Sequence, residues 1–295
     1  MFDYRLLETL AAVVESEGFE RASRQLHVTQ SAVSQRLSVL EQQLGHPLVE
    51  RTHPPRATPF GQSVLRHFRQ VSALESDLMS TLQGVDSDGF TTLRIAVNAD
   101  SLGFWMVDAI TPLLTEESLL VDIVVADQEQ TLNFLRRGEV VGAISALDTP
   151  VTGCASHPLG SMVYRARATH AFKDRWFPRG FRKESARMAP AITFNRDDQL
   201  QSRLLEGIGL GAGEYPTHYV PDTQMFFELC RRGAGYAMLP ELQVRQRDAG
   251  EELVDLAPKR AIRVPLYFHH WNVETRLVRS LVTAMQDAEG LEALT

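Results

Sequence analysis

Residues 18–45 have the sequence GFERASRQLHVTQSAVSQRLSVLEQQLG, which predicts two short helices joined by a tight turn. We expect the first helix over Glu20–His27, then a turn in which Val28 is buried and Thr29 caps the second helix. In the second helix the apolar residues recur at steps of four, three and four, on one helical face: Val33, Leu37, Leu40 and Leu44. The stretch therefore has the form of a helix-turn-helix, with Ala22 small and Leu26 apolar where the two helices meet.

The opposite face of the second helix carries side chains that can contact the edges of bases. Gln can pair with adenine through two hydrogen bonds, and Ser can donate to or accept from any base. In helix-turn-helix proteins the N-terminal part of the second helix enters the major groove of double-stranded DNA. The expected DNA contacts are Thr29, Gln30, Ser31, Ser34, Gln35 and Arg36. Two ordinary amphipathic helices with a solvated face would give a similar pattern, so the residues that follow decide between them.

A hairpin is expected directly after the second helix. Leu48–Thr52 predicts a strand, His53–Arg56 a turn and Ala57–Thr58 the return, and such a hairpin after a recognition helix is a wing. We expect Arg56 at the tip of the wing, where an arginine suits the negative potential of the minor groove, although a solvated turn residue would look the same. Arg51 is a second candidate for DNA contact in the wing.

The charge of this region is lower than that of many DNA-binding modules. Residues 1–58 contain six Arg, no Lys and seven acidic residues, a net charge of −1. A nucleic-acid-binding module often has a basic excess. Only a local cluster of arginines is available here: Arg24, Arg36, Arg51 and Arg56. We therefore expect modest non-specific affinity per subunit, with dimerisation and base contacts supplying the rest.

Residues 1–60 resemble the DNA-binding domain of LysR-type transcriptional regulators. The matched positions occur in order and are dense: Phe19–Ser23, Leu26, Val28–Gln35, Leu40–Glu41, Leu44–Gly45, Pro47–Leu48, Arg51 and Thr58–Gly61. The resemblance also covers the length and layout of the remaining chain. It implies an α/β protein with an N-terminal winged helix-turn-helix, a long dimerisation helix and a two-lobed effector domain like that of periplasmic binding proteins.

The composition is that of an ordinary globular protein. The 295 residues are enough for two domains, and a net charge of −7 argues against a protein that coats DNA. Two cysteines without motif spacing, Cys154 and Cys230, fit a reducing compartment. Neither a signal peptide nor a run of about 18 apolar residues occurs. We expect a bacterial, cytoplasmic, nucleoid-associated protein with no membrane partner.

No sequence motif points to catalysis. The chain has no Gly-x-Ser-x-Gly, no Gly-rich phosphate loop and no metal-ligand spacing, so we expect no enzyme, no catalytic residue, no cofactor and no metal. His269 and His270 are adjacent, but neighbours on a strand point to opposite faces and cannot jointly bind one metal ion there. A structural role is the expectation for both.

A long helix is expected to begin at Thr58-Pro59, with the threonine as cap and proline at the first helical position, and to continue to about Leu82. Its apolar residues follow at steps of three and four: Val64, Phe68, Val71, Leu74, Leu78 and Leu82. The resemblance favours the same helix of a second subunit as the partner of this stripe, in a coiled coil. Packing on the chain's own effector domain is the alternative. Gly84–Gly89 predicts a hinge.

Beyond Gly89 strands and helices alternate, which predicts a parallel sheet with right-handed crossovers in two lobes. The expected strands are Leu93–Val97, Leu120–Ala126, Val140–Ala146, Ala191–Asn195, Tyr236–Leu239 and Val264–His269. The expected helices are Leu102–Leu114, Thr131–Arg137, Gln199–Gly207, Asp222–Arg232 and Val273–Ala288. We place the DNA-binding domain at 1–58, the linker helix and hinge at 59–88, and the effector domain at 89–295. Within the effector domain, lobe 1 is about 89–163 plus 267–295, and lobe 2 is about 164–266.

Ligands of open α/β sheets bind outside the carboxyl ends of the strands, near helix N-termini. Polar residues follow several of the expected strands: Asn98, Asp100, Ser101, Asp127, Ser145 and Asp198. Backbone N–H groups and Ser101 could hold a ligand carboxylate, and Asp100 could hold an ammonium or guanidinium group. Capping of the following helices would use the same residues. The several acidic groups indicate a cationic ligand.

Two further segments, Leu93–Leu102 and Leu135–Ala143, resemble the arginine/lysine-responsive branch of the LysR-type family, as do Arg51-Thr52 and Pro54–Arg56 of the wing. That branch includes regulators of basic amino-acid export. The resemblance implies L-lysine or L-arginine as effector, promoter DNA and RNA polymerase as partners, a homodimer or homotetramer, and control of amino-acid export or metabolism genes. A solute-binding or transport module, and a LysR-type regulator that senses an unrelated small molecule, are the alternatives. The choice between lysine and arginine, the operator and the sign of regulation stay open.

Overall fold

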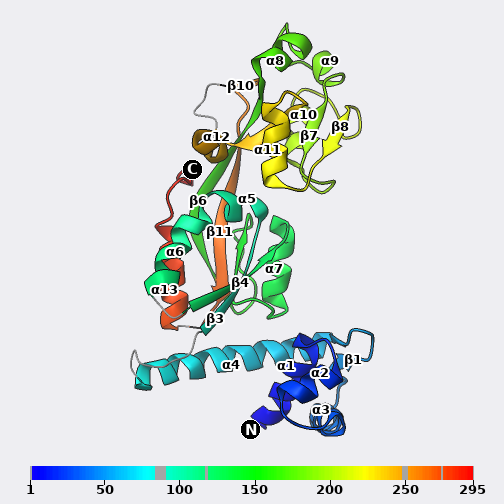
Figure 1. The fold of residues 1–295 in the computed structure, drawn as a ribbon, viewed down its shortest axis with the longest axis vertical. Coiled ribbons are helices and arrows are strands. Elements are labelled where there is room, and N and C mark those ends of the chain that lie inside the picture. Colours follow the sequence, from blue (N-terminus) through cyan, green and yellow to red (C-terminus); the bar gives the residue numbers. More distant parts are fainter. Residues whose placement is uncertain (1, 84–90, 117–118, 248–251, 274, 295) are drawn as a thin grey trace.

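The computed structural model describes residues 2–83, 91–116, 119–247, 252–273 and 275–294. Along its long axis it shows an N-terminal helical unit, one long helix that crosses beneath the lobes, and the two α/β lobes themselves (Figure 1). Among these residues no helix combines the length and apolarity needed to span a membrane. The expected hinge at Gly84–Gly89 lies outside the described residues.

The N-terminal unit contains the predicted helix-turn-helix. Its helices are α1 (Tyr4–Glu15), α2 (Phe19–Gln25) and α3 (Gln30–Leu44). The Thr29 hydroxyl accepts the backbone N–H of Ala32, which confirms the predicted cap. The first helix ends earlier than expected, and Val28 is only partly buried against the core. That core is built from one face of each helix and from the start of the wing: Leu6, Leu7, Leu10, Val13, Ala22, Val33, Leu37, Leu40, Leu48 and Val49.

The wing is present, but its tip differs from the prediction. Strands β1 (Val49–Glu50) and β2 (Arg56–Ala57) form an antiparallel pair. The predicted position of Arg56 at the tip was wrong, because Arg56 lies in the ladder opposite Glu50. Residues 51–55 form the tip, where the Thr52 hydroxyl donates to the Pro54 carbonyl at 2.7 Å. The buried Pro55 anchors the end of this loop, so the return strand begins one residue earlier than expected.

Helix α4 (Pro59–Gln83) begins where the sequence predicts. The Thr58 hydroxyl accepts the N–H of Gly61 at 3.0 Å and donates to the Pro47 carbonyl at 2.8 Å, so it also ties the helix to the wing. The apolar stripe divides into two parts: Val64 and Phe68 pack on the core of the N-terminal unit, whereas Leu74 and Leu78 are exposed. Val71 is partly buried, and the side chain of Leu82 lies outside the described part of the structure.

Both lobes are built on one mixed sheet, with strands in the order β4-β3-β5-β11-β6-β9-β7-β8 and β10 paired with β6. The strands are β3 (Thr91–Val97), β4 (Leu119–Val125), β5 (Gly142–Ser145), β6 (Cys154–Thr169), β7 (Ala191–Thr193), β8 (Thr217–Tyr219), β9 (Tyr236–Pro240), β10 (Leu253–Asp255) and β11 (Ile262–Trp271). The helices are α5 (Ala99–Phe104), α6 (Met106–Glu116), α7 (Gln128–Arg136), α8 (His170–Trp176), α9 (Lys183–Ala186), α10 (Leu200–Glu206), α11 (Thr223–Arg231), α12 (Glu241–Arg247) and α13 (Arg276–Gln286). We call the part with β3–β5, α5–α7 and α13 lobe 1, and the part with β7–β9 and α8–α12 lobe 2.

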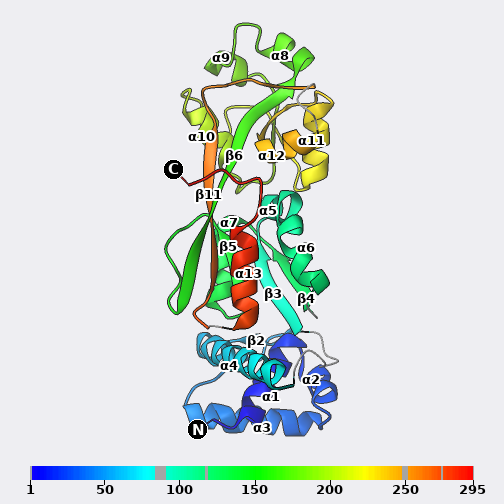
Figure 2. The ribbon, with the colours of Figure 1, turned by 90° about the vertical axis from the view of Figure 1, so that its left-hand side faces the viewer.

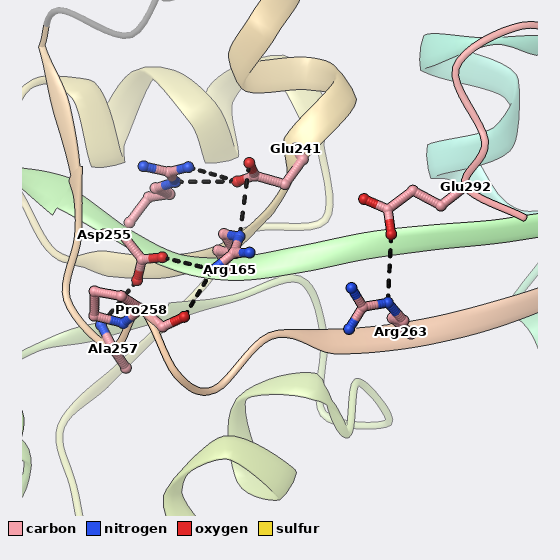
Figure 3. Close-up of polar contacts among 8 residues, drawn as sticks. Arg165, Glu241, Asp255, Ala257, Pro258, Arg263 and Glu292 are labelled. Carbon is pink, nitrogen blue, oxygen red and sulfur yellow. Dashed lines mark hydrogen bonds and ion pairs between the residues drawn. The ribbon is translucent and has the colours of Figure 1, made fainter. Parts of the chain in front are cut away.

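The expected parallel sheet is only partly correct. Strands β3, β4 and β5 are parallel, as are β7, β8 and β9, but β6 and β11 between them are antiparallel to each other and to their neighbours. These two long strands run side by side from one lobe into the other (Figure 2). The sequence did not predict β6, because charged residues interrupt its apolar pattern. Ion pairs explain them: Arg165 contacts Asp255 at 3.0 Å and Glu241 at 3.7 Å, and Arg167 contacts Glu241 at 2.6 Å (Figure 3).

One predicted helix is broken. The expected helix Leu102–Leu114 is two helices, α5 and α6, which meet at Trp105. The Trp105 backbone leaves the helical region, with φ −133°, and its side chain is buried in the core shared by both lobes. Burial of this large side chain therefore outweighs the continuation of the helix.

Candidate functional site

The first turn of α3 presents the residues predicted to read DNA. Thr29, Gln30, Ser31 and Gln35 are exposed, while Ser34 and Arg36 are partly buried. The hydroxyl groups of Thr29 and Ser31 lie 3.0 Å apart, so these two side chains restrain each other. The only apolar residues of this turn are Ala32, which is partly buried, and Val33, which faces the core. The exposed surface of the turn is therefore polar.

The wing is held in a fixed position relative to α3. The Glu41 carboxylate accepts the backbone N–H of Leu48 at 2.8 Å and that of Val49 at 3.4 Å. Arg51 and Arg56 are exposed and lie on this wing. The arginines of the wing and the first turn of α3 therefore belong to one rigid unit.

Arg24, the fourth member of the expected basic cluster, is paired within its own helix. Its guanidinium contacts Glu20, and both side chains are about 70% exposed. An exposed pair of this kind contributes little stability, but the carboxylate lowers the positive potential that Arg24 offers to a phosphate. The N-terminal unit thus has a low net charge, and Glu20 also partly neutralises the charge of Arg24.

Replacement of both Gln30 and Gln35 by Ala is expected to separate specific from non-specific DNA binding. Each bidentate contact with a base contributes about 1–3 kcal/mol of discrimination, so affinity for the cognate promoter should fall about tenfold or more per lost contact. Affinity for unrelated DNA should stay within about twofold, because phosphate contacts dominate it. Gel-shift titrations on both DNAs measure the two constants. Gln43→Ala, at the exposed far end of α3, is the control; an equal loss on both DNAs would exclude Gln30 and Gln35 as readers.

A cavity of about 640 Å³ lies between the two lobes. Five of the six predicted effector residues line it: Asn98, Asp100, Asp127, Ser145 and Asp198. Asn98 and Asp100 follow β3, Asp127 follows β4 and Ser145 ends β5, all in lobe 1, whereas Asp198 follows β7 of lobe 2. The carboxyl ends of parallel strands thus converge from both lobes on one space, as expected for an α/β ligand site.

The sixth predicted residue, Ser101, is not at the cavity. It is fully buried within α5, and its hydroxyl has no hydrogen-bond partner among the described residues. Asn98, which precedes α5, is 6% exposed, lines the cavity, and carries an Oδ1 atom that lacks a partner among the same residues. A buried acceptor without a donor is costly, so the Asn98 carbonyl favours a ligand that brings an N–H group.

Asp100 is the most perturbed acid of the cavity. The Tyr164 hydroxyl donates to its Oδ2 at 2.6 Å. Burial raises the pKa of Asp100 from 3.8 to about 6; the Tyr164 hydrogen bond opposes this rise, and the nearby Asp198 adds to it. The free cavity therefore disfavours the negative charge of Asp100, and a cationic ligand would remove that penalty.

Asp198 and Asp127 complete the acidic group. The Asp198 carboxylate accepts the backbone N–H of Phe194 at 3.2 Å and of Leu200 at 2.9 Å, yet burial still raises its pKa. Asp127, before α7 in lobe 1, accepts the side-chain amide of Asn195 from lobe 2 at 3.3 and 3.4 Å. This contact joins the two lobes at the cavity.

Several cavity residues were missed by the sequence analysis. Tyr164 lies in β6, a strand that was not predicted, so nothing local indicated its contact with Asp100. Arg203 of α10 and Gln243 of α12 also line the cavity. Their helices belong to lobe 2, and only the tertiary fold brings them to the same cavity as Asp100. The exposed Arg203 makes no ion pair among the described residues, so its charge is available to a ligand.

The adjacent histidines of β11 have different neighbours, as expected. His269 Nε2 lies 2.7 Å from the Leu147 carbonyl, whereas His270 Nε2 lies 3.0 Å from Nε2 of His157. Burial lowers the pKa of both. The described part of the chain contains no group of three or more His, Cys, Asp or Glu side chains that could hold a metal ion.

The winged helix-turn-helix, the long helix and the two-lobed cavity together define a DNA-binding protein with a small-molecule sensor. Residues 4–62 match the family model described as "Bacterial regulatory helix-turn-helix protein, lysR family". The HTH-type transcriptional regulator ArgP of Pseudomonas fluorescens (strain Pf0-1) is 44% identical over 272 residues, covering 92% of this chain and 91% of that protein.

Two solved structures extend the similarity to the whole fold. The crystal structure of ArgP from Mycobacterium tuberculosis superposes with a TM-score of 0.91 at 36% identity, covering both chains completely. Full-length LysG from Corynebacterium glutamicum, solved with the effector arginine bound, has a TM-score of 0.80 at 30% identity, covering 99% of this chain and all of that one. The chain therefore belongs to the LysR family of transcriptional regulators and is similar to its ArgP and LysG members. It is a DNA-binding regulator and not an enzyme, as the sequence predicted.

Proposed function

We propose that the effector of this regulator is L-arginine or L-lysine, bound between the lobes. The observation that carries the proposal is the partly buried Asp100, which lines the cavity together with Asp127 and Asp198. A guanidinium or ammonium group beside Asp100 would neutralise a carboxylate that the free cavity holds at a cost. The arginine bound to LysG supports the same class of ligand.

Each charged group of the amino acid would face a side chain of opposite charge in the cavity. We assign the cationic side-chain group of the ligand to Asp100. An N–H of the same group would also donate to the unpaired Oδ1 atom of Asn98. We expected Ser101 to bind the α-carboxylate, but Ser101 does not line the cavity. We therefore assign the α-carboxylate to Arg203 of lobe 2, which does. The α-ammonium group then faces Asp127 and Asp198. Such a ligand touches both lobes, and its binding would favour their closed arrangement.

The output is control of promoter DNA by paired winged helices. Val64 and Phe68 pack on their own N-terminal unit, whereas Leu74, Leu78 and Met79 farther along α4 are exposed and available to a second subunit. We propose a homodimer or homotetramer in which the effector alters the spacing of the DNA-reading units and contact with RNA polymerase. Domains 1–58, 59–88 and 89–295 would serve DNA binding, linkage and sensing, in the cytoplasm at the nucleoid, on genes of amino-acid export or metabolism.

A thermal-shift screen of the common amino acids tests the effector class. Stabilisation by arginine or lysine, with no response to glutamate or leucine, is the expected result, and calorimetry then ranks the two basic amino acids. Decarboxylated arginine (agmatine) separates the two ends of the ligand: it should bind about tenfold or more weakly, because it leaves Arg203 unpaired. Absence of any response to arginine and lysine would reject this effector class.

Arginine affinity is expected to fall in acid. Binding of the cation requires ionised Asp100, whose pKa in the free protein is about 6. Below that value the ligand competes with a proton, so the dissociation constant should rise about tenfold between pH 7.5 and pH 5. Calorimetry at the two pH values measures the change, with net proton release expected near pH 6. Equal affinities at both values would contradict the role of Asp100.

A further inference from the structure

We propose that Arg69 of α4 couples the effector cavity to the DNA-reading unit, through the C-terminal end of α7 on one side and Glu15 of α1 on the other. The inference rests on the proposed function, since it needs an effector in the cavity. The Arg69 guanidinium joins three parts of the chain that are far apart in sequence: α1 of the N-terminal unit, α4, and the turn that follows α7 in lobe 1. The ribbon shows α4 between α1 and lobe 1 (Figure 1).

The Arg69 guanidinium uses both of its edges. Nε and Nη2 donate to Oε1 of Glu15 at 3.2 and 2.8 Å, and Nη1 donates to the carbonyl of Gly138. Only 17% of the Arg69 side chain is exposed, whereas the other arginine ion pairs of the N-terminal unit are at least 60% exposed. The partner Glu15 is 45% exposed, so the defined geometry of these charge-assisted hydrogen bonds depends on the largely buried Arg69.

The backbone of lobe 1 approaches α4 closely at the same place. Gly138 follows α7 with φ +68°, a conformation that favours glycine. A Cβ atom on Gly138 would lie 2.7 Å from Cβ and 2.8 Å from Cα of Arg66, so no side chain fits between the turn and α4. Arg66 Nη1 also donates to the Arg136 carbonyl at 3.4 Å. The two arginines thus hold the C-terminal end of α7, where cations are favoured by the helix dipole.

Helix α7 connects this contact to the cavity. Its other end carries Asp127 and Gln130, both of which line the cavity, and Asp127 contacts Asn195 of lobe 2. The helix has nine residues, about 13 Å, and its continuous i→i−4 backbone hydrogen bonds join one end to the other. A ligand that displaces Asp127 therefore also displaces the carbonyl of Gly138, and with it the acceptor of Arg69.

A second contact fixes α4 along its length. The Asp77 carboxylate accepts the backbone N–H of Arg276, the first residue of α13, at 2.9 Å. Helix α4 thus places two arginines at the C-terminal end of α7 and the Asp77 carboxylate at the N-terminal end of α13. Each charge is opposite in sign to the end of the helix dipole that it faces. With Asp77 held, a shift at Arg69 tilts α4 relative to lobe 1, and the Glu15 contact passes this tilt to α1.

The test measures how strongly arginine changes DNA affinity in the full-length chain. We expect the ratio of promoter dissociation constants with and without arginine to lie in the range of about 5- to 150-fold for the wild type. In Arg69→Gln this ratio should fall to within about twofold of one, while calorimetry still shows arginine binding. Arg232→Gln is the matched control, since it removes an exposed arginine ion pair of lobe 2 and should keep the wild-type ratio.

Two further variants separate coupling from simple loss of a contact. The double variant Glu15→Arg, Arg69→Glu retains an ion pair between α1 and α4. The carboxylate at position 69 cannot donate to the Gly138 carbonyl, so that hydrogen bond is lost. The ratio should therefore stay near one in the double variant. Gly138→Ala keeps Arg69 and Glu15 but forces the turn away from Arg66, and should have the same effect.

Spin labels on exposed positions of α1 and α7, with distances measured by pulsed electron resonance, give a readout that needs no effector. Arg69→Gln and Gly138→Ala should each broaden the distance distribution relative to wild type and Arg232→Gln. A wild-type ratio in Arg69→Gln with arginine bound, or unchanged distances in both variants, would overturn the role of Arg69. Failure of arginine to bind the wild type while the distances still broaden would instead reject the proposed effector and leave the contact intact.

Discussion

Asp100→Asn is expected to weaken arginine binding about a hundredfold and, at the same time, to stabilise the ligand-free protein. The loss of affinity follows from the removal of the buried charge that meets the ligand's cation, a change that typically costs 2–5 kcal/mol, or roughly thirtyfold or more. The gain in stability follows from the removal of a carboxylate that burial disfavours. The asparagine Oδ1 can still accept from Tyr164, so the cavity keeps its shape.

The sign of the stability change depends on pH in a defined way. The pKa of Asp100 is raised in the folded state, from 3.8 to about 6, so the penalty is absent below pH 4 and complete above pH 6. At pH 7.5 it amounts to about 2–3 kcal/mol, which corresponds to a rise of about 4 °C or more in the melting temperature of the variant. The difference from wild type should shrink between pH 6.5 and pH 5.

Calorimetry and thermal melts of ligand-free protein check both effects. The exposed Asp108 of α6 supplies the control, because Asp108→Asn changes the same charge in the same lobe away from the cavity. Undiminished arginine affinity in Asp100→Asn would end the assignment of the ligand's cation to this residue. A drop in melting temperature at pH 7.5 would contradict the stated cause of its raised pKa.

Gly61→Ala is expected to abolish high-affinity promoter binding while arginine binding persists. A Cβ atom on Gly61 would lie 2.0 Å from the backbone carbonyl oxygen of Leu48, which cannot rotate away as a side chain could. The first turn of α4 and the first strand of the wing must then separate, at a cost of about 3 kcal/mol. Because Leu48 also binds Glu41 of α3, the wing would shift relative to the reading helix.

Gel shifts should show at least about a tenfold loss of promoter affinity for Gly61→Ala, with the arginine dissociation constant unchanged within twofold. Gly18→Ala is the matched control in the same unit. Gly18 has extended backbone, and a Cβ atom there would meet nothing closer than 3.5 Å, the Arg21 side chain. Normal promoter binding by Gly61→Ala would mean that the wing and α4 are not as closely joined as the structure has them.

Local signals account for what the sequence predicted well. The helix α3 has an apolar residue at every turn, a Thr cap and a terminal glycine, Gly45, so no tertiary information is needed to find it. The strand ends that carry Asp100, Asp127 and Asp198 follow short apolar runs, which is why the acids of the cavity could be chosen. The cap at Thr58 is of the same local kind.

Non-local contacts account for what the sequence missed. Arg165 is stable in the middle of β6 only because Asp255 and Glu241 lie beside it, and these acids are more than 70 residues away. Ser101 was expected at the cavity because it begins a helix after a strand, but it lies on the buried face of α5 together with Phe104. Arg56 was misplaced because the length of a hairpin loop depends on how Pro55 packs.

The order of strands in the sheet has a consequence for synthesis of the protein. In lobe 1, β11 lies between β5 and β6, and α13 packs beside α6, so residues 262–286 supply its centre. A growing chain can complete the N-terminal unit and α4 early, whereas lobe 1 has to wait for almost the last segment to leave the ribosome. A product cut short before β11 would therefore carry the complete winged helix-turn-helix with an incomplete lobe 1, and we expect it to bind promoter DNA without any response to an effector.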